Sequence, residues 1–160
     1  MSRRARVIVA STRAANGVYD DTTGPLMAEW FAARGWSCEV EVVADGEPVR
    51  GALEAALAEG PDAVLTSGGT GVSPTDATPE MTRPLIEREL PGVAEEIRRR
   101  GTATTPLAVV SRGLAGVAGT TVIVNLPGSR GGVRDGLDVL DELLEHLVDQ
   151  LHGGDHVRHD

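Results

Sequence analysis

Short apolar runs rich in Val, Ile and Leu alternate along the chain with segments whose apolar residues recur every three or four positions. Runs of the first kind suit buried strands, and the second periodicity predicts amphipathic helices. Leu26, Met27, Trp30 and Phe31, for example, share one face of such a segment, which Gly35 ends. We therefore predict strands over residues 5–10, 38–44, 62–67, 107–111 and 120–125, and helices over residues 22–34, 47–59, 91–101 and 133–151, with one more opening at Thr78.

Repeated strand–helix units predict a mostly parallel sheet covered by helices on both faces, an α/β fold. The glycine-rich link between residues 111 and 120 is too short for a helical crossover, so one strand of the last pair should be antiparallel. Pro84 should kink or divide the helix that opens at Thr78, because it lacks an amide proton. We expect a single domain over residues 1–151 and a polar tail over residues 152–160.

Composition narrows the classes of function. The 41% hydrophobic content supports one well-packed core in 160 residues. All fifteen basic residues are Arg, which excludes a Walker-type phosphate loop and a Schiff-base enzyme. Cys38 is the only cysteine, so disulfides within the chain and cysteine-based metal sites are excluded. A net charge of −9 with few aromatic residues argues against a nucleic-acid surface.

No apolar run reaches membrane-spanning length, and the first strand is too short for the apolar region of a signal peptide. We therefore expect a cytoplasmic protein without a membrane partner. The histidines of the tail, His152, His156 and His159, offer a weak metal site, but a loose polar end is the simpler interpretation.

Polar residues and glycines follow four of the predicted strands. In a parallel sheet the carboxyl ends of the strands meet at one edge, where ligands bind. Here that edge should carry Ser11 and Thr12, Asp45, the loop over residues 68–76 and the loop over residues 125–129.

The loop after the third strand is the strongest local motif. It begins with Ser67, Gly68, Gly69, Thr70 and Gly71. Its glycines leave backbone amides uncovered, and the helix at Thr78 adds a positive dipole end, so phosphate binding is expected. A tight strand-to-helix turn is the alternative. The loop does not fit the dinucleotide fingerprint, because Pro74 stands where the third glycine belongs.

Two carboxylates belong to the same edge. Thr78, with Pro79 after it, is the better helix cap, which leaves Asp76 in the loop to face a ligand or to form an Asx-turn. Asp45 is a poor cap because Pro48 has no amide proton to offer it. Paired carboxylates suit Mg²⁺ when a substrate supplies phosphate oxygens.

The loop after the last strand offers further contacts. Gly128 allows a close approach, while Asn125 and Ser129 provide hydrogen bonds; an ordinary turn with Ser129 as a cap is again the alternative.

Residues 67–80, with Gly-Gly-Thr-Gly and then Asp-Ala-Thr-Pro-Glu, resemble the signature of the molybdopterin-binding family of molybdenum-cofactor synthesis proteins. Residues 16–20, 87–92, 111–112 and 125–128 match the family in the same order, so the resemblance covers nearly the whole chain. It implies a three-layer α/β/α domain, a homotrimer, and a site for molybdopterin and nucleotide at the strand ends. Some relatives carry a lysine after the Leu-Pro-Gly turn, where this chain has Ser129 and Arg130.

The resemblance also implies an activity: molybdopterin adenylyltransferase, which transfers AMP from Mg-ATP to the phosphate of molybdopterin, with a molybdenum insertase as a possible partner. Asp45 and Asp76 match the aspartates that active members use, and would bind Mg²⁺ together with the nucleotide. A non-catalytic molybdopterin carrier or scaffold, and a nucleotide-binding module with another role, are the alternatives. The substrate-binding residues expected are Ser11, Ser67, Gly68, Gly69, Thr70, Gly71, Glu80, Asn125, Pro127, Gly128 and Ser129.

Overall fold

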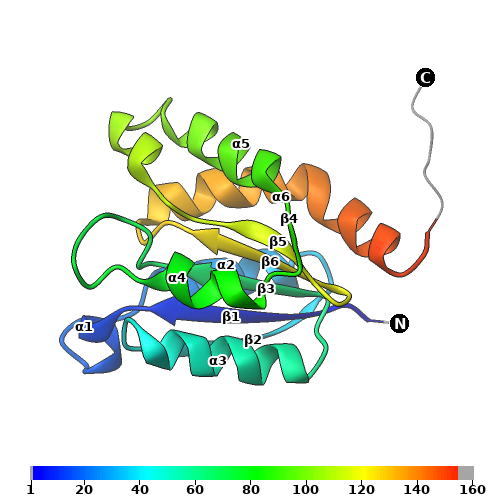
Figure 1. The fold of residues 1–160 in the computed structure, drawn as a ribbon, viewed down its shortest axis with the longest axis horizontal. Helices are drawn as coiled ribbons and strands as arrows, with labels where there is room; N and C mark the ends of the chain where they lie inside the picture. Colours follow the sequence, from blue (N-terminus) through cyan, green and yellow to red (C-terminus); the bar gives the residue numbers. More distant parts are fainter. Residues whose placement is uncertain (1, 155–160) are drawn as a thin grey trace.

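The computed structural model describes residues 2–154, arranged as one mixed sheet between two layers of helices (Figure 1). The predicted α/β architecture is confirmed, with most boundaries within two or three residues of those expected. The elements are β1 (Arg4–Ala10), α1 (Thr12–Ala15), α2 (Thr23–Ala32), β2 (Ser37–Val43), α3 (Glu47–Ala58), β3 (Ala63–Ser67), α4 (Thr78–Thr82), η1 (Arg83–Leu85), β4 (Arg88–Glu89), α5 (Pro91–Gly101), η2 (Pro106–Val110), β5 (Ala115–Ala118), β6 (Thr121–Leu126) and α6 (Arg130–Leu151).

The six strands lie in the order β2-β1-β3-β6-β5-β4. Strands β2, β1, β3 and β6 pair in parallel, while β5 pairs antiparallel with both β6 and β4. One strand of the sheet, β5, therefore runs against the others, as predicted. The parallel strands point their carboxyl ends toward the side of the molecule that carries α1 (Figure 1).

Alternating residues of the central strands face two separate hydrophobic clusters. Val7 and Val9 of β1 pack into the larger one, with α2, α5 and α6. Ile8 and Ala10 face the other way, onto Val49 and Leu53 of α3. This period of two, with helices on both sides, fixes the three layers and holds the strand ends rigidly.

The strand predicted over residues 107–111 is wrong. Residues Pro106–Val110 form the 3₁₀-helix η2, and Thr105 caps it by accepting a hydrogen bond from the Leu107 amide. Leu107 is 72% exposed and Val109 65%, so their apolar character does not indicate burial. The antiparallel partner of β6 is instead β5, joined to it through Gly119 at φ +59°.

The segment after Thr78 forms α4 and then η1, divided at Pro84 as predicted. Thr78 is not the helix cap, however: Ala77 takes that position, and the Thr78 hydroxyl makes no capping bond. Two short elements, α1 and β4, were not predicted because four and two residues are too few to show a period. Within residues 2–154, none of the helices is both long enough and apolar enough to cross a membrane.

Candidate functional site

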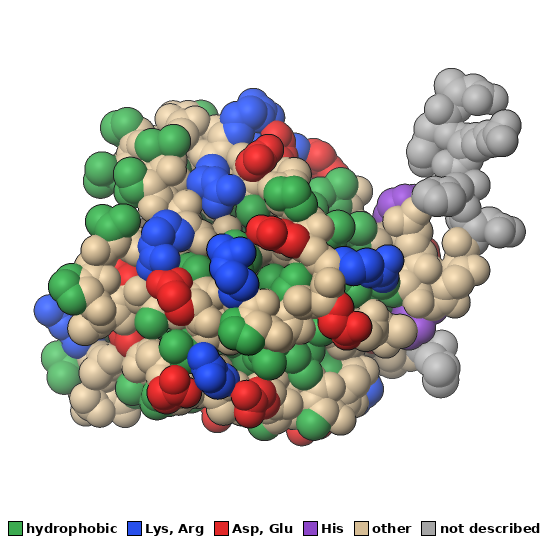
Figure 2. Space-filling model, viewed as in Figure 1, with side chains coloured by type: hydrophobic (Ala, Val, Ile, Leu, Met, Phe, Trp, Pro, Cys, Tyr) green, Lys and Arg blue, Asp and Glu red, His purple; other side chains and the backbone are tan. Residues whose placement is uncertain are grey.

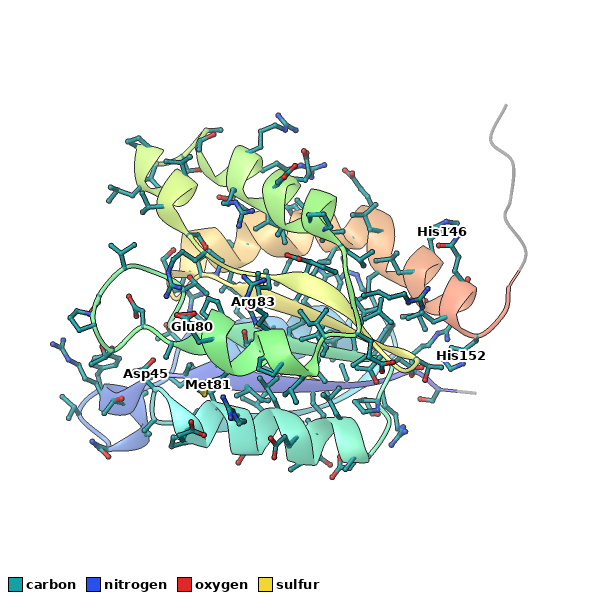
Figure 3. All side chains as sticks on the ribbon, viewed as in Figure 1. Asp45, Glu80, Met81, Arg83, His146 and His152 are labelled. Atoms are coloured by element: carbon teal, nitrogen blue, oxygen red, sulfur yellow. The ribbon has the colours of Figure 1, made fainter. Side chains whose placement is uncertain are left out.

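The carboxyl ends of β1, β2, β3 and β6 surround a cavity of about 540 Å³. We call it the acidic cavity, because Asp20, Asp21, Asp45 and Asp76 line it and Arg13 is the one basic residue among its described walls. Asp45 lies at the end of the molecule that carries α1 (Figure 3). The cavity brings together seven of the predicted site residues: Ser11, Asp45, Ser67, Gly68, Gly69, Asp76 and Gly128.

Asp45 is held by Thr12 and not by the helix that follows it. The Thr12 hydroxyl donates to Asp45 Oδ2 at 2.9 Å and its amide donates at 3.2 Å, while the Asp45 amide donates to Thr12 Oγ1 at 3.1 Å. Gly46 is the N-cap of α3, so Asp45 does not cap that helix, as predicted. Within residues 2–154, Asp45 Oδ1 has no hydrogen-bond partner, and it lies beside Gly69.

The loop over residues 68–76, which we call the glycine loop, approaches its neighbours so closely that two of its positions require glycine. Gly68 has φ +94°, and a Cβ there would lie 2.3 Å from the Ala10 carbonyl oxygen. Gly69 has φ +68°, and a Cβ there would lie 2.3 Å from Thr78 Oγ1 and 3.1 Å from Asp45 Oδ1. The Gly68 amide donates to the Leu126 carbonyl and is already used. The amides of Gly69, Thr70 and Gly71 have no partner within residues 2–154.

Asp76 is partly committed to its own loop. Its Oδ2 accepts a hydrogen bond from the Ser73 amide at 3.0 Å, and its amide donates to the Ser73 carbonyl at 2.9 Å. This turn reaches back three residues and differs from an Asx-turn, which bonds forward. Within residues 2–154, Asp76 Oδ1 has no hydrogen bond and stays available to a ligand.

The two serines of the cavity wall have structural bonds. Ser11 caps α1 by accepting a hydrogen bond from the Ala14 amide. The Ser67 hydroxyl donates to the Pro127 carbonyl at 2.8 Å and lies 3.0 Å from Thr23 Oγ1. The bond from Ser67 to Pro127 connects the end of β3 with the loop after β6, and so fixes the distance between the two loops at the site.

A second cavity, of about 460 Å³, lies against the same two loops. Thr70, Gly71, Pro127 and Ser129 line it, so these predicted site residues are present here and not in the acidic cavity. We call it the apolar cavity, since its other walls include Ile97, Leu107, Ala108 and Val110. Ser129 caps α6 by accepting from the Gly132 amide. Apolar side chains also gather on the surface over η2 (Figure 2).

Asn125 and Glu80 are among the wall residues of neither cavity. Asn125 is 4% exposed; its Oδ1 accepts from the Leu114 amide, and its Nδ2 donates to the hydroxyls of Thr66 and Thr82. All three bonds hold the core together. Glu80 accepts two hydrogen bonds from Arg112, at 2.7 and 2.9 Å (Glu80 is labelled in Figure 3).

Sequence analysis missed several residues of the site. The hydrogen bond from Thr12 to Asp45 was not predicted, although Thr12 was expected at this edge, and Tyr19 and Asp20 line the acidic cavity from a loop that the sequence only matched to the family. Asp21 lines the same cavity and accepts from the amides of Thr23 and Gly24 at the start of α2. An aspartate two residues before a helix was the available signal for that contact.

The described residues fit Mg²⁺ only in part. Asp45 and Asp76 line the same cavity, and within residues 2–154 the Oδ1 atom of each has no hydrogen-bond partner. Carboxylate oxygens are the donor type that this ion prefers. No group of three or more His, Cys, Asp or Glu side chains within residues 2–154 could hold a metal ion. The two carboxylates could therefore supply only part of the ligands of such an ion, and the remaining ligands would have to come from a substrate or water.

The tail histidines lie mostly outside the described residues. His156 and His159 are beyond residue 154, and His152 follows the last residue of α6. His152 Nε2 lies 3.0 Å from Asp62 Oδ1, at the opposite end of the sheet from the acidic cavity. His146 is exposed on α6 (Figure 3).

Comparisons with known proteins agree with the fold and the motifs. A family profile described as "Probable molybdopterin binding domain" matches residues 6–146. A molybdenum cofactor biosynthesis bifunctional protein of Chlorobaculum tepidum is 37% identical over 155 residues, which are 96% of this chain and 50% of that protein. A molybdopterin adenylyltransferase of Helicobacter pylori J99 is 33% identical, covering 92% of this chain and 86% of that one.

A solved structure agrees as well. The molybdopterin biosynthesis Mog protein of Mycobacterium ulcerans superposes with a TM-score of 0.91 at 56% identity, over 94% of this chain and 99% of that one. The chain spans about half the length of the bifunctional relatives. The profile match, the relatives and the shared fold together show that the chain belongs to the molybdopterin-binding family of molybdenum-cofactor biosynthesis proteins.

Proposed function

We propose that this protein is a molybdopterin adenylyltransferase that uses Mg-ATP. The observation that carries the proposal is the acidic cavity, where two carboxylates, each with one oxygen unpaired within the described residues, lie on the same wall as Gly69. Gly69 is the first of three successive residues whose amides have no partner within residues 2–154. Amides of this kind bind phosphate, and paired carboxylates bind a divalent cation that a nucleotide helps to hold. The relatives named molybdopterin adenylyltransferase support the same activity.

In the proposed reaction a terminal phosphate oxygen of molybdopterin attacks the α-phosphorus of ATP. The new P–O bond forms as the bond to the β-phosphate oxygen breaks, and pyrophosphate leaves with the electron pair. Such a transfer needs positioning and neutralisation of charge more than covalent chemistry by the protein. The protein's part is thus to hold two phosphate groups in line.

The amides of Gly69, Thr70 and Gly71 would hold the molybdopterin phosphate. Asp45, oriented by Thr12, and Asp76, oriented by Ser73, would direct their free oxygens toward the nucleotide phosphates and Mg²⁺. When bound, the ion would neutralise phosphate charge that the carboxylates alone would repel. Gly128, whose added Cβ would lie 3.4 Å from Gly68 Cα, keeps the two loops close together.

The apolar cavity would receive the ring of the nucleotide. Pro127 and Ser129 belong to the loop that we assign to the nucleotide, and both line this cavity. Apolar walls with a few polar groups suit a flat heterocycle. Gly71 lines this cavity and is in close contact with Asp76, which lines the acidic cavity, so a ligand that occupied both cavities would pass over the glycine loop.

A homotrimer, a molybdenum insertase that accepts the adenylated product, and a cytoplasmic location complete the proposal. They come from the sequence and its resemblance. A non-catalytic carrier of molybdopterin is the second candidate; the open amides would serve it equally, whereas the two carboxylates favour the enzyme.

An adenylyl-transfer assay tests the proposal directly. Purified protein is mixed with molybdopterin, ATP and Mg²⁺, and adenylated molybdopterin and pyrophosphate are quantified by mass spectrometry. Asp76→Asn should abolish transfer, yet keep molybdopterin binding, because an asparagine oxygen can still accept from the Ser73 amide. Exposed Asp138 on α6 supplies the control Asp138→Asn, expected to turn over normally. Binding without product in the unaltered protein would identify a carrier instead.

A further inference from the structure

The side chain of Arg112 donates hydrogen bonds to two separate points of the glycine loop. Its Nε donates to the Gly71 carbonyl at 2.8 Å, and its Nη2 donates to the Asp76 carbonyl at 3.0 Å. Its Nη1 donates to both carboxylate oxygens of Glu80 on α4. In addition, the Arg112 amide donates to the Thr70 carbonyl at 2.8 Å. One residue thus makes five hydrogen bonds across the segment from Thr70 to Glu80.

The loop has little else to fix it. Residues 72–75 are exposed, with Val72 at 75%. Within the described residues, the loop's own bonds are the turn between Ser73 and Asp76, a long 3.4 Å contact between the hydroxyls of Ser73 and Thr75, and the bond from the Thr78 amide to the Gly69 carbonyl. An exposed loop with so few contacts opens readily unless it is tied from outside. Arg112 is that tie, because its planar guanidinium holds the carbonyls of Gly71 and Asp76 at a set separation.

The position of Arg112 separates it from the groups that would touch a ligand. It is among the described wall residues of neither cavity, whereas Gly71 lines the apolar cavity and Asp76 the acidic one. A Cβ on Gly71 would lie 2.8 Å from Asp76 Oδ2, so these two residues are in close contact. A shift of the loop would therefore move the Asp76 carboxylate and the wall of the apolar cavity together.

We propose that Arg112, with Glu80 as its counterion, is a positioning residue that holds the Asp76 carboxylate and the open loop amides in their working geometry. The catalytic role of Asp76 rests on the proposed function. The restraint of the loop by Arg112, which we call the clamp, does not. Lysine cannot replace Arg112, because an ammonium group cannot donate in three directions of one plane at these distances.

The test compares Arg112→Lys with the matched control Arg34→Lys. Arg34 also makes a two-nitrogen ion pair, with Asp141, but on a distant part of the surface. In Arg112→Lys, amide hydrogen exchange at Asp76 and Thr78 should quicken about 10-fold or more, and kcat should fall about 10- to 100-fold with KM nearly unchanged. Arg34→Lys should leave both readouts as in the unaltered protein.

A second pair of measurements guards against simple misfolding. Glu80→Gln, which keeps an acceptor but removes the charge, should give a smaller change of the same kind. Added guanidinium ion should restore part of the activity of Arg112→Ala at a concentration too low to unfold it. Unchanged loop exchange in Arg112→Lys would overturn the proposal. If the unaltered protein transfers no AMP, the proposed function fails, while the exchange data still decide whether the clamp exists.

Discussion

Gly69 is a tightly constrained residue of the acidic cavity, because an added Cβ would lie 2.3 Å from Thr78 Oγ1 and 3.1 Å from Asp45 Oδ1. A glycine in this loop is expected from the sequence, since backbone amides must be open to bind phosphate. The contact with Thr78 was not predictable, because it depends on how α4 packs on the loop. Likewise, the sequence identifies Asp45 as a poor cap but gives no sign that Thr12, 33 positions away, binds it.

Gly69→Ala should lower the free energy of unfolding by about 2 kcal/mol or more. A left-handed φ costs a non-glycine residue roughly 1–2 kcal/mol, and the clash with Thr78 Oγ1 adds to it. Chemical denaturation measures the loss. The control is Gly51→Ala on the exposed side of α3, where an added Cβ meets nothing within 4 Å and should stabilise by about 0.5–1 kcal/mol. Equal stability of the two variants would contradict the constraint.

Thr78→Val should not destabilise the ligand-free protein. The Thr78 hydroxyl is buried without a hydrogen-bond partner within residues 2–154, and an unpaired buried hydroxyl costs about 1–3 kcal/mol. We expect the free energy of unfolding to stay level or rise by about 1 kcal/mol in chemical denaturation, because valine fills the same space without the unpaired hydroxyl.

Thr82→Val on the same helix is the control. Thr82 is equally buried, but it donates to the Thr78 carbonyl and accepts from Asn125, so its loss should cost about 1–3 kcal/mol. A Thr78→Val variant that loses as much stability as Thr82→Val would show that the Thr78 hydroxyl has a structural partner.

Helices and strands were predictable where the spacing of their apolar residues repeats over enough positions to be recognised. The apolar residues of α6, spaced by three and four, gave its existence and its buried face, and the short buried β3 was equally clear. The segment 107–111 failed because apolar residues there are exposed around η2 and the apolar cavity. The strand β5 was missed because Gly116 weakens its pattern; that glycine is needed where Ile86 and the Arg88 carbonyl come too close for a side chain.

The end of α5 provides a test at the scale of one element. Hydrogen bonds from Arg99 and then Arg100 hold the pKa of the Glu96 carboxyl at about 2, below its ordinary value of 4.5. A lowered pKa in the folded state means stability that is present above pH 4.5 and is lost as the pH falls toward 2. Melting temperatures from pH 6 to pH 2 should therefore drop less steeply in Glu96→Gln than in the unaltered protein. Parallel curves would contradict the ion pairs, whose contribution is small at this exposed position.

At the scale of the whole molecule, the order of strands and helices predicts which edge of the sheet carries the candidate site. The net charge of the chain does not predict the arrangement of residues around that site. Parallel strands must bring their carboxyl ends together, so the edge carrying Asp45, Gly69 and Asp76 followed from element order. A chain with a net charge of −9 has four aspartates on the walls of the cavity where the proposed substrates would place their phosphates. Division of the predicted loop residues between two cavities was not predictable, since it depends on where η2 and α5 pack.

This charge balance gives the last prediction, which concerns ionic strength. A basic nucleotide site loses affinity as salt rises, whereas an acidic cavity on an acidic protein should repel ATP through charges that salt screens. Without divalent cations, calorimetric titration should therefore show ATP binding several-fold tighter when ionic strength is raised from about 0.05 to about 0.3 M, at which the screening length falls from roughly 14 to 6 Å. Adenosine, which carries no phosphate, should bind equally well at both salt concentrations. With Mg²⁺ present the dependence on salt should shrink, because the ion would neutralise the phosphates that Asp45 and Asp76 face in the proposed complex. If ATP binding without Mg²⁺ instead weakens as salt rises, an arginine near the cavity such as Arg13 would dominate its charge, and the assignment of the aspartates as cation ligands would fail.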